Sequence, residues 1–376
     1  MPGGSMTDEQ RAWLILSGAF VSDRQLSRLL DACGSVEAAV NANSATLERA
    51  IPHETHRQSI LQPDESWLAR AAAWLAEPGH RIVCRRSVDY PALLAQIPDP
   101  PILIYVAGSV DCLHLPALAI VGSRNPTRGG VDNADRFAAQ LGAAGFCIVS
   151  GLAYGIDSAA HRGALRSKAY TIAVLGHGID RVYPRRNSQL AGDIVAGGAV
   201  ISEFPFGCPP RREYFPLRNR LISGLSLATL VVEAATRSGS LITARLAGDQ
   251  GRDIFAIPGS IHNPMARGCH KLLRQGATLV ETPQDIIDEV APQLDQLMQN
   301  AHETPQPEKL NKIQDKDYKL LIDALGFDPA TSDEIARNSG LTIDQVSSML
   351  LILELEGEIE SLSGGKYSRM RSNARQ

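Results

Sequence analysis

Short apolar runs rich in β-branched residues recur through the middle of the chain, and amphipathic stretches separate them. The apolar runs are residues 118–121, 146–150, 170–175, 199–202, 228–233, 253–257 and 277–280. The stretches with helical periodicity are residues 132–144, 156–165, 187–195 and 240–249. Strands that alternate with helices at this spacing indicate βαβ units. The pattern therefore predicts an α/β domain built on a parallel sheet.

The two ends of the chain have different patterns. Residues 8–51 contain several short amphipathic segments, which predict a small helical domain. An Ala-rich helix and two strands, HRIVCR and PPILIYVAG, are expected to follow and to pack beside the sheet. Residues 293–316 are polar and contain two prolines, which is typical of a linker. Helical segments at 318–325, 332–338 and 342–356 precede the hairpin pattern EIESLSGGKYSRM, and this order predicts a winged helix.

Charge is unevenly distributed along the 376 residues, whose formal net charge is −4. Residues 118–275 carry 19 basic and 10 acidic side chains, a net charge of +9. Residues 1–117 carry 9 basic and 13 acidic side chains, a net charge of −4. Residues 276–376 carry 9 basic and 18 acidic side chains, a net charge of −9. An anionic partner is therefore expected to bind the middle of the chain.

Several classes of protein are disfavoured by the sequence. It contains no apolar run of about 20 residues and no signal-peptide pattern, so we do not expect it to span a membrane. The 6 cysteines form no CxxC pair, which disfavours a structural zinc site and a disulfide framework. Because nothing suggests a disulfide framework, a reducing cytoplasm fits best. His161 and His177 could bind a metal, but no carboxylate or cysteine recurs at ligand spacing. We expect neither a metal nor a cofactor.

Glycine, serine and arginine follow the predicted strands. The first strand ends in AIVGSRNPTRGG, the second in SGLAYGIDSAAHRGAL and the third in LGHGIDRVYPRRN. Gly122 allows a close approach of the backbone to a ligand, and Arg124 offers a planar donor group suited to phosphate. The motifs are neither GxGxxG nor a P-loop, so the support for NAD or ATP is weak. Because parallel strands present their carboxyl ends at one edge, these turns are expected to converge there.

The segment PRREYFPLRNRLISGL has the highest density of arginine. Four arginines lie within ten residues, interleaved with Tyr214 and Phe215. Guanidinium groups bind phosphates and aromatic rings stack on bases, which is the chemistry of a single-stranded nucleic-acid site. The alternative is a solvated basic face above two core aromatics. We favour the first interpretation because the local net charge is positive.

These motifs together resemble the DNA-processing protein A family (DprA, also called Smf). The resemblance is dense from residue 93 to residue 290 and includes FPLRNRLISGL, RSGSLITARLA, GRDIFAIPGSI and GCHKLLRQGA. It implies an extended Rossmann-like core at 65–292, a helical SAM-like domain at 7–60, a linker at 293–316 and a winged helix at 317–370. It also implies a homodimeric single-stranded DNA-binding protein of natural transformation that protects DNA and loads the RecA recombinase.

The resemblance assigns a DNA-binding role to residues at matching motif positions. Arg185 and Arg212 stand where the family often has Lys, Phe215 is expected to stack on a base, and the RNR element is expected to act partly as structural support. The full set is Gly122, Ser123, Arg124, Arg185, Arg212, Phe215, Arg218, Asn219, Arg220, Ser238, Gly239 and Ser240. Leu272 and Leu273, in an amphipathic helix near the end of the core, are candidates for the dimer interface.

Two other classes of function remain open. An enzyme that cleaves N-glycosidic bonds of nucleotides would need a carboxylate at the strand ends, and Glu233 is the first candidate and Asp157 the second. We favour the interpretation that Glu233 orients nearby arginines. A duplex-reading regulator would use the winged helix, but residues 342–356 contain no Lys or Arg. We therefore expect this domain to contact protein and, like the acidic N-terminal helices, to contribute little to DNA affinity.

Overall fold

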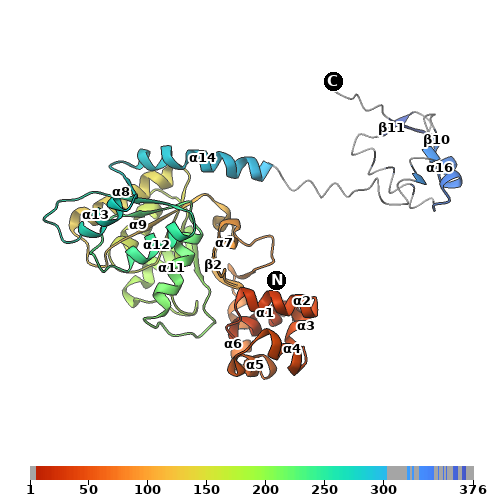
Figure 1. Cartoon of the computed structure of the whole chain (residues 1–376), viewed down its shortest axis with the longest axis horizontal. Coiled ribbons are helices and arrows are strands. Elements are labelled where there is room, and N and C mark those ends of the chain that lie inside the picture. The colour runs from red at the N-terminus through yellow and green to blue at the C-terminus, as the bar shows by residue number, and fades with distance from the viewer. Residues whose placement is uncertain are drawn as a thin grey trace. The chain divides into compact units, whose positions relative to one another are not determined.

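The structure is a computed structural model in two compact units, Met1–Asp295 and Gln296–Gln376 (Figure 1). It describes residues 6–302 and, further on, residues 320–321, 324–325, 330–342, 346, 350, 353, 359–362 and 366–369. In these residues, no helix combines the length and the apolar character needed to cross a membrane.

A nine-stranded sheet forms the centre of the first unit. Its order is β1-β2-β6-β5-β4-β3-β7-β8-β9. The seven strands from β6 to β9 in this order are parallel, whereas β2 pairs antiparallel with both β6 and β1. The bounds are β1 His80–Cys84, β2 Leu103–Gly108, β3 Ala117–Val121, β4 Cys147–Ser150, β5 Thr171–Val174, β6 Gly198–Ser202, β7 Ala228–Val231, β8 Asp253–Ala256 and β9 Thr278–Leu279. The predicted α/β class is confirmed.

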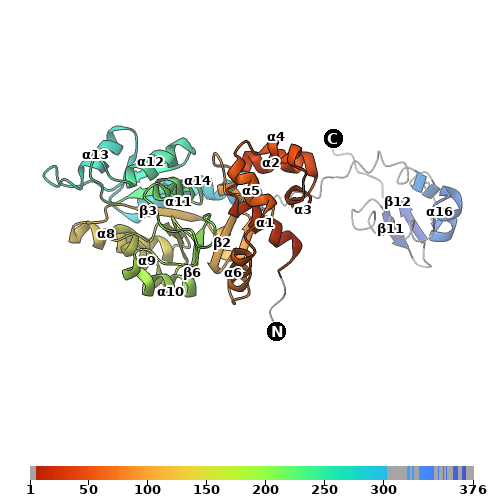
Figure 2. The same cartoon turned by 90° about the horizontal axis from the view of Figure 1, so that it is seen from below.

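Helices cover both faces of the sheet, which is why its central strands are apolar at nearly every position. The strands β3 to β7 are buried along their whole length. Ile172 and Val174 of β5 enter one core cluster and Ala173 the other, as the alternation of a strand requires. Figure 2 shows helices α8 Arg128–Ala143, α9 Ile156–Arg166 and α10 Ser188–Gly197 on one side, and α11 Tyr214–Gly224, α12 Ser240–Asp249 and α13 Arg267–Arg274 on the other.

The N-terminal helices belong to the same compact unit as the sheet. They are α1 Asp8–Gly18, α2 Asp23–Cys33, α3 Val36–Val40, α4 Ser44–Ala50, α5 Glu54–Leu61 and α6 Glu65–Leu75. Their apolar side chains share a core with β2, where the Ser17 hydroxyl lies 3.2 Å from the Tyr105 hydroxyl. Capping boxes at Thr7 and Ser22 fix the starts of α1 and α2. Two further short elements are α7 Ala92–Ala95 and the 3₁₀ turn η1 Asp111–His114.

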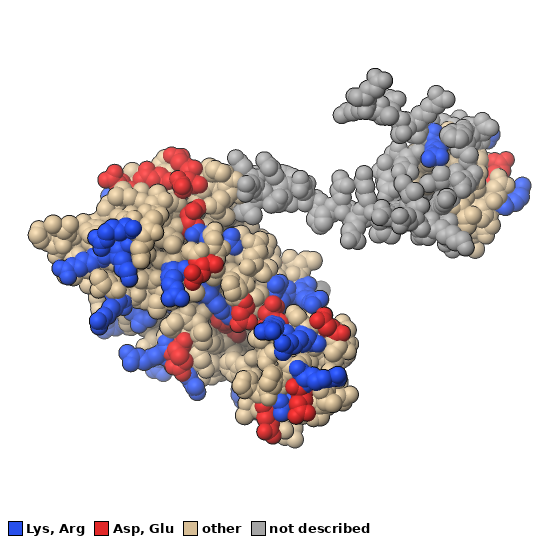
Figure 3. Space-filling model, in the orientation of Figure 1, with Lys and Arg blue, Asp and Glu red and all other residues tan. Residues whose placement is uncertain are grey.

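The helix that follows β9 is longer than the sequence pattern suggests. Helix α14 runs from Pro283 to His302, so residues 293–302, expected to open the linker, are helical. Residues 303–319 lie outside the described part of the chain. On the face drawn in Figure 3, acidic side chains gather over α14, which carries Asp285, Asp288 and Glu289.

The second unit contains the elements of the predicted C-terminal domain that the structure describes. Helix α16 (Ser332–Ser339) begins at a capping box on Thr331. Strands β11 (Ile359–Leu362) and β12 (Lys366–Arg369) form the expected antiparallel hairpin, and β10 (Ala330–Thr331) pairs with β12. Most of the predicted helix 342–356 lies outside the described residues.

Candidate nucleic-acid interface

The carboxyl ends of β3, β4, β5 and β7 meet at one edge of the sheet, which we call the rim. After the neighbouring strands β3 and β7, the chain continues in opposite directions along the sheet. From β3 it continues through α8 to β4, whereas from β7 it continues through α12 to β8. Ligands of open α/β sheets bind in the crevice at such a point.

The turn after β3 is tightly packed and presents Arg124 to solvent. A side chain at Gly122 would place its Cβ 2.6 Å from Ile156 Cγ1, so only glycine fits. The Ser123 N–H donates to the Glu233 carbonyl at 2.7 Å, and the Ser123 hydroxyl accepts from the Asn125 N–H at 3.1 Å. Ser123 is therefore buried within the turn, while Arg124 is exposed.

Phe215 opens α11 and lies against the turn that follows β5. A Cβ at Gly176 would be 3.0 Å from the Phe215 ring, so the absence of a side chain there makes room for this ring. The guanidinium carbons of Arg124 and Arg218 lie 5.7 and 5.9 Å from its centroid. The Tyr183 ring, about half exposed, lies 5.9 Å away at an interplanar angle of 40°. The rim thus combines two aromatic rings with cations, an arrangement suited to stacked bases and phosphates.

The buried Arg218 side chain connects the strand ends that form the rim. It is 4% exposed and donates to the Gly151 carbonyl at 2.9 Å and to the Val174 carbonyl, which joins the ends of β4 and β5. Burial lowers the pKa of Arg218 to about 10, so it remains charged at neutral pH. Its Nε donates to Asn219 Oδ1 at 3.2 Å. These contacts give Arg218 and Asn219 the supporting role expected for part of the RNR element, and a direct contact with DNA stays a prediction.

Arg220 also has a supporting contact. Its guanidinium forms an ion pair with Glu203, just after β6, and both side chains are largely buried. Burial raises the pKa of Glu203, and the neighbouring Arg220 opposes this shift. Arg220 therefore anchors α11 to the end of β6, and a contact of Arg220 with DNA stays a prediction.

Arg185 and Arg212 remain available for phosphates. Both are exposed, and Arg185 belongs to the 3₁₀ turn η2 (Arg185–Asn187) beside Tyr183. Within residues 6–294, no ion pair joins Arg124, Arg185 or Arg212 to a carboxylate. These three arginines are the exposed cations among the residues predicted to bind DNA.

The serine-rich turn before α12 lies at the same edge, after β7. The Ser238 and Ser240 hydroxyls are 2.7 Å apart, and the Ser240 N–H donates to the Ser238 hydroxyl at 3.3 Å. Ser240 is buried, whereas Gly239 between them is exposed. The hydroxyls thus shape the start of the helix, and the backbone at Gly239 is the part that faces solvent.

Comparison with known proteins supplies the family. Residues 81–291 match the model of DNA recombination-mediator protein A, and residues 300–365 match that of the DprA winged helix domain. The chain belongs to the DprA/Smf family. Protein Smf of Escherichia coli K12 is 41% identical over 318 residues, 84% of each chain. DNA processing protein DprA of Streptococcus pneumoniae is 44% identical over 200 residues, 53% of this chain and 71% of the relative.

Two solved structures of the DprA family have the same fold. The X-ray structure of DprA from Streptococcus pneumoniae is 34% identical and superposes with a TM-score of 0.67, covering 76% of this chain and 99% of that one. DprA from Helicobacter pylori, described for its single-stranded DNA binding mode, is 29% identical and superposes with a TM-score of 0.52. The match covers 57% of this chain and 96% of that one. The winged helix predicted at the C-terminus is confirmed by its family model.

Glu233 has a structural task in this DprA-family chain. Its carboxylate accepts from the Thr127 N–H at 2.8 Å and from the Thr127 hydroxyl at 2.6 Å. Thr127 in turn caps α8 through the Gly130 N–H at 3.0 Å. The expectation that Glu233 orients arginines is wrong, because it orients Thr127 and the start of α8. Asp157, also buried, accepts from the Ala153 N–H at 3.3 Å, and burial raises its pKa.

The two histidines considered as metal ligands are core residues. His161 Nδ1 lies 2.7 Å from the Thr171 hydroxyl, and burial lowers the pKa of His161 to about 3. His177 Nδ1 lies 3.0 Å from the Gly178 carbonyl, and burial lowers its pKa as well. In the described part of the chain, no three side chains are grouped to hold a metal ion.

Leu272 and Leu273 do not form an exposed pair. Leu272 is 8% exposed and Leu273 is half-buried, and both pack into the core beneath α13. Leu272 is thus a core residue of α13, and a self-association surface at this helix stays a prediction. Tyr183 was missed in the sequence. The only signal for it was an aromatic residue directly before the PRR motif.

Proposed function

We propose that this protein binds single-stranded DNA at the rim without sequence preference, protects the strand and loads the RecA recombinase onto it in natural transformation and DNA recombination. The observation that carries the proposal is the Phe215 ring, flanked by two guanidinium groups at 5.7 and 5.9 Å. The solved relative from Helicobacter pylori, described for binding single-stranded DNA, supports it. The RecA role rests on the resemblance to the family.

In the proposed mechanism, phosphates contact the exposed Arg124, Arg185 and Arg212, and a base stacks on Phe215. Stacking on a side chain needs an open base face, which neighbouring base pairs cover in a duplex. The rim should therefore prefer single strands. Stacking does not read the hydrogen-bonding edge of a base, so little sequence preference is expected. Gly122 and Gly176 keep the rim narrow enough for the rings and guanidinium groups to converge.

We also propose that the protein acts as a cytoplasmic homodimer without a cofactor and without catalytic activity. Three exposed arginines neutralise few phosphates, and two rims linked in a dimer would gain affinity through effective concentration. Both oxygens of the Glu233 carboxylate accept hydrogen bonds from Thr127. This supports a binding role over cleavage of a glycosidic bond, which would need a carboxylate available to the substrate. Loading of RecA would appear as faster RecA ATP hydrolysis on oligo-dT when the protein is added.

The test is fluorescence anisotropy with labelled oligo-dT at several salt concentrations, with unlabelled duplex as competitor. The wild type is expected to prefer the single strand. Arg124→Ala should weaken binding and lower the salt slope by about one, because one phosphate contact is lost. Arg136→Ala is the matched control, since this arginine lies in the body of α8 with its side chain 65% exposed. Equal binding of duplex, unchanged in Arg124→Ala, would contradict the proposal.

A further inference from the structure

A groove of about 520 Å³ lies between the N-terminal helices and the loop 203–213 that joins β6 to α11. Phe20 and Trp67 line it from the helices, and Phe206 and Tyr214 line it from the other wall. Its charged lining residues are Asp64 and Arg211. Aromatic rings on both walls suit flat, stackable groups.

The first turn of α11 joins this groove to the rim. Phe215 lies on the rim against Gly176, while its neighbour Tyr214 stands in the groove. The guanidinium carbon of Arg211 lies 5.7 Å from the centroid of the Tyr214 ring. The combination of a ring and a cation seen at Phe215 and Arg124 is thus repeated one residue earlier on the same helix.

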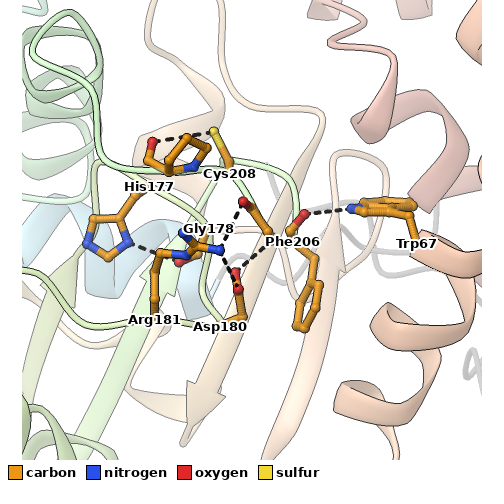
Figure 4. A network of polar contacts seen from close by, with 9 residues as sticks. Trp67, His177, Gly178, Asp180, Arg181, Phe206 and Cys208 are labelled. Carbon is orange, nitrogen blue, oxygen red and sulfur yellow. Dashed lines mark hydrogen bonds and ion pairs between the residues drawn. The ribbon is translucent and has the colours of Figure 1, made fainter.

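Hydrogen bonds fix the loop between the rim and helix α6. On the rim side, the Gly178 N–H donates to the Cys208 carbonyl at 2.9 Å. On the helix side, the Trp67 indole N–H donates to the Phe206 carbonyl at 2.6 Å. Figure 4 shows Trp67 reaching this carbonyl from α6 while His177 and Gly178 lie across the loop. The groove is therefore formed in advance, which lowers the entropy cost of binding.

The exposed residues of the groove point to a ligand. Phe20 is 49% exposed and has a φ of +53°, a left-handed conformation that bulky residues rarely adopt. Residues in such conformations cluster at functional sites. The Asp64 carboxylate caps α6 by accepting from the Ser66 and Trp67 N–H groups, and hydrogen bonds from Ser66 and Trp67 lower its pKa. The Asp64 carboxylate is therefore already hydrogen-bonded to the start of α6. Arg211 is the cation in the groove that can bind a phosphate.

We infer that this groove binds the nucleotides that continue from the rim along the same DNA strand. Bases would stack on Trp67, Tyr214 and Phe20, and Arg211 would contact a phosphate. The inference rests on the proposed function, and continuity with the rim favours a nucleic-acid strand over a peptide. It makes the N-terminal helices part of the DNA site, although residues 1–117 carry 9 basic and 13 acidic side chains.

The test measures oligo-dT affinity as a function of length in the full chain. Phe20→Ser and Arg211→Gln are expected to bind short oligonucleotides, which fill only the rim, like the wild type. Longer ones should bind about fivefold more weakly or worse, the factor that corresponds to the lower end of base stacking on an aromatic ring. Val88→Ser, at a 96% exposed apolar residue, and Arg136→Gln are the matched controls.

Tryptophan fluorescence gives a second readout. Trp13 and Trp74 are buried, whereas Trp67 is partly exposed in the groove. The chain has only these 3 tryptophans. Long oligo-dT should quench the emission, short oligo-dT should not, and the quenching should disappear in Trp67→Phe.

The outcomes separate this inference from the proposed function. If Phe215→Ala weakens binding at every length while the groove variants bind like the wild type and emission is unchanged, the inference is overturned and the groove fits a peptide instead. If Phe215→Ala also binds like the wild type, the proposed function itself fails. Loss confined to long oligonucleotides in the groove variants supports the inference.

Discussion

The four arginines between residues 211 and 220 differ in what their guanidinium groups touch. Arg211 lies over the Tyr214 ring and Arg212 is exposed. Arg218 donates to two backbone carbonyls, and Arg220 pairs with Glu203. Arg211 and Arg212 are thus available to bind an anion. Arg218 and Arg220 instead hold in place the segments that form the binding site.

His161 predicts a pH dependence of stability. Burial lowers its pKa to about 3 in the folded protein, so the unfolded chain binds more protons between pH 3 and about 6.5. Stability should therefore fall as the pH falls through this window, by on the order of 1 kcal/mol per unit from this residue alone. Urea unfolding at pH 7.5 and pH 5 should show a smaller difference in His161→Gln than in the wild type. An identical difference would show that His161 does not contribute.

At the scale of elements, polar contacts between segments set the position of the rim. Glu233, after β7, holds Thr127 at the start of α8, and Arg220 holds α11 against the end of β6. Helix α11 carries both Tyr214 and Phe215, so its placement decides where the aromatic rings stand. The precision of the site depends on these supporting contacts.

Arg220→Ala is expected to lower the free energy of unfolding by about 3–5 kcal/mol, because Glu203 would be left buried without its partner. The double variant Arg220→Met with Glu203→Leu should recover much of this loss, since no uncompensated charge remains. Urea unfolding of the two variants measures both effects. A loss below about 1 kcal/mol in Arg220→Ala would show that the pair acts as an ordinary exposed salt bridge.

The sequence predicts elements better than contacts. The periodicity gave the seven strands of the parallel sheet, because apolar β-branched runs alternate there with amphipathic helices. It could not separate Arg212 from Arg220, since both lie in one basic run and only the fold brings Glu203 to one of them. It also could not show that Leu272 is buried, because an amphipathic helix looks the same whether its apolar face meets the sheet or a partner. The groove joins residues far apart in sequence, such as Phe20 and Tyr214, and left no local signal.

At the scale of the whole molecule, the basic side chains concentrate in the segment that forms the parallel sheet and its helices. Residues 118–275 have a net charge of +9, and the flanking segments are acidic. The rim belongs to the first compact unit, together with the N-terminal helices. The C-terminal unit is expected to contribute little to DNA affinity, because residues 315–376 carry 7 basic and 11 acidic side chains.

A chain shortened to residues 1–302 should therefore bind oligo-dT within about threefold of the full chain in the same salt, since the phosphate contacts that set most of the affinity stay in place. Anisotropy titrations of the two proteins make the comparison. A tenfold weaker affinity of the shortened chain would place part of the DNA site in the winged helix.

The central claim is that a base stacks on Phe215, and the most direct test compares Phe215→Leu with Phe215→Tyr in oligo-dT binding. Leucine fills similar space without a ring, whereas tyrosine keeps the ring. Phe215→Leu is expected to bind about 5- to 150-fold more weakly, the range that corresponds to 1–3 kcal/mol of stacking, and Phe215→Tyr close to the wild type. Wild-type affinity in Phe215→Leu would contradict the account.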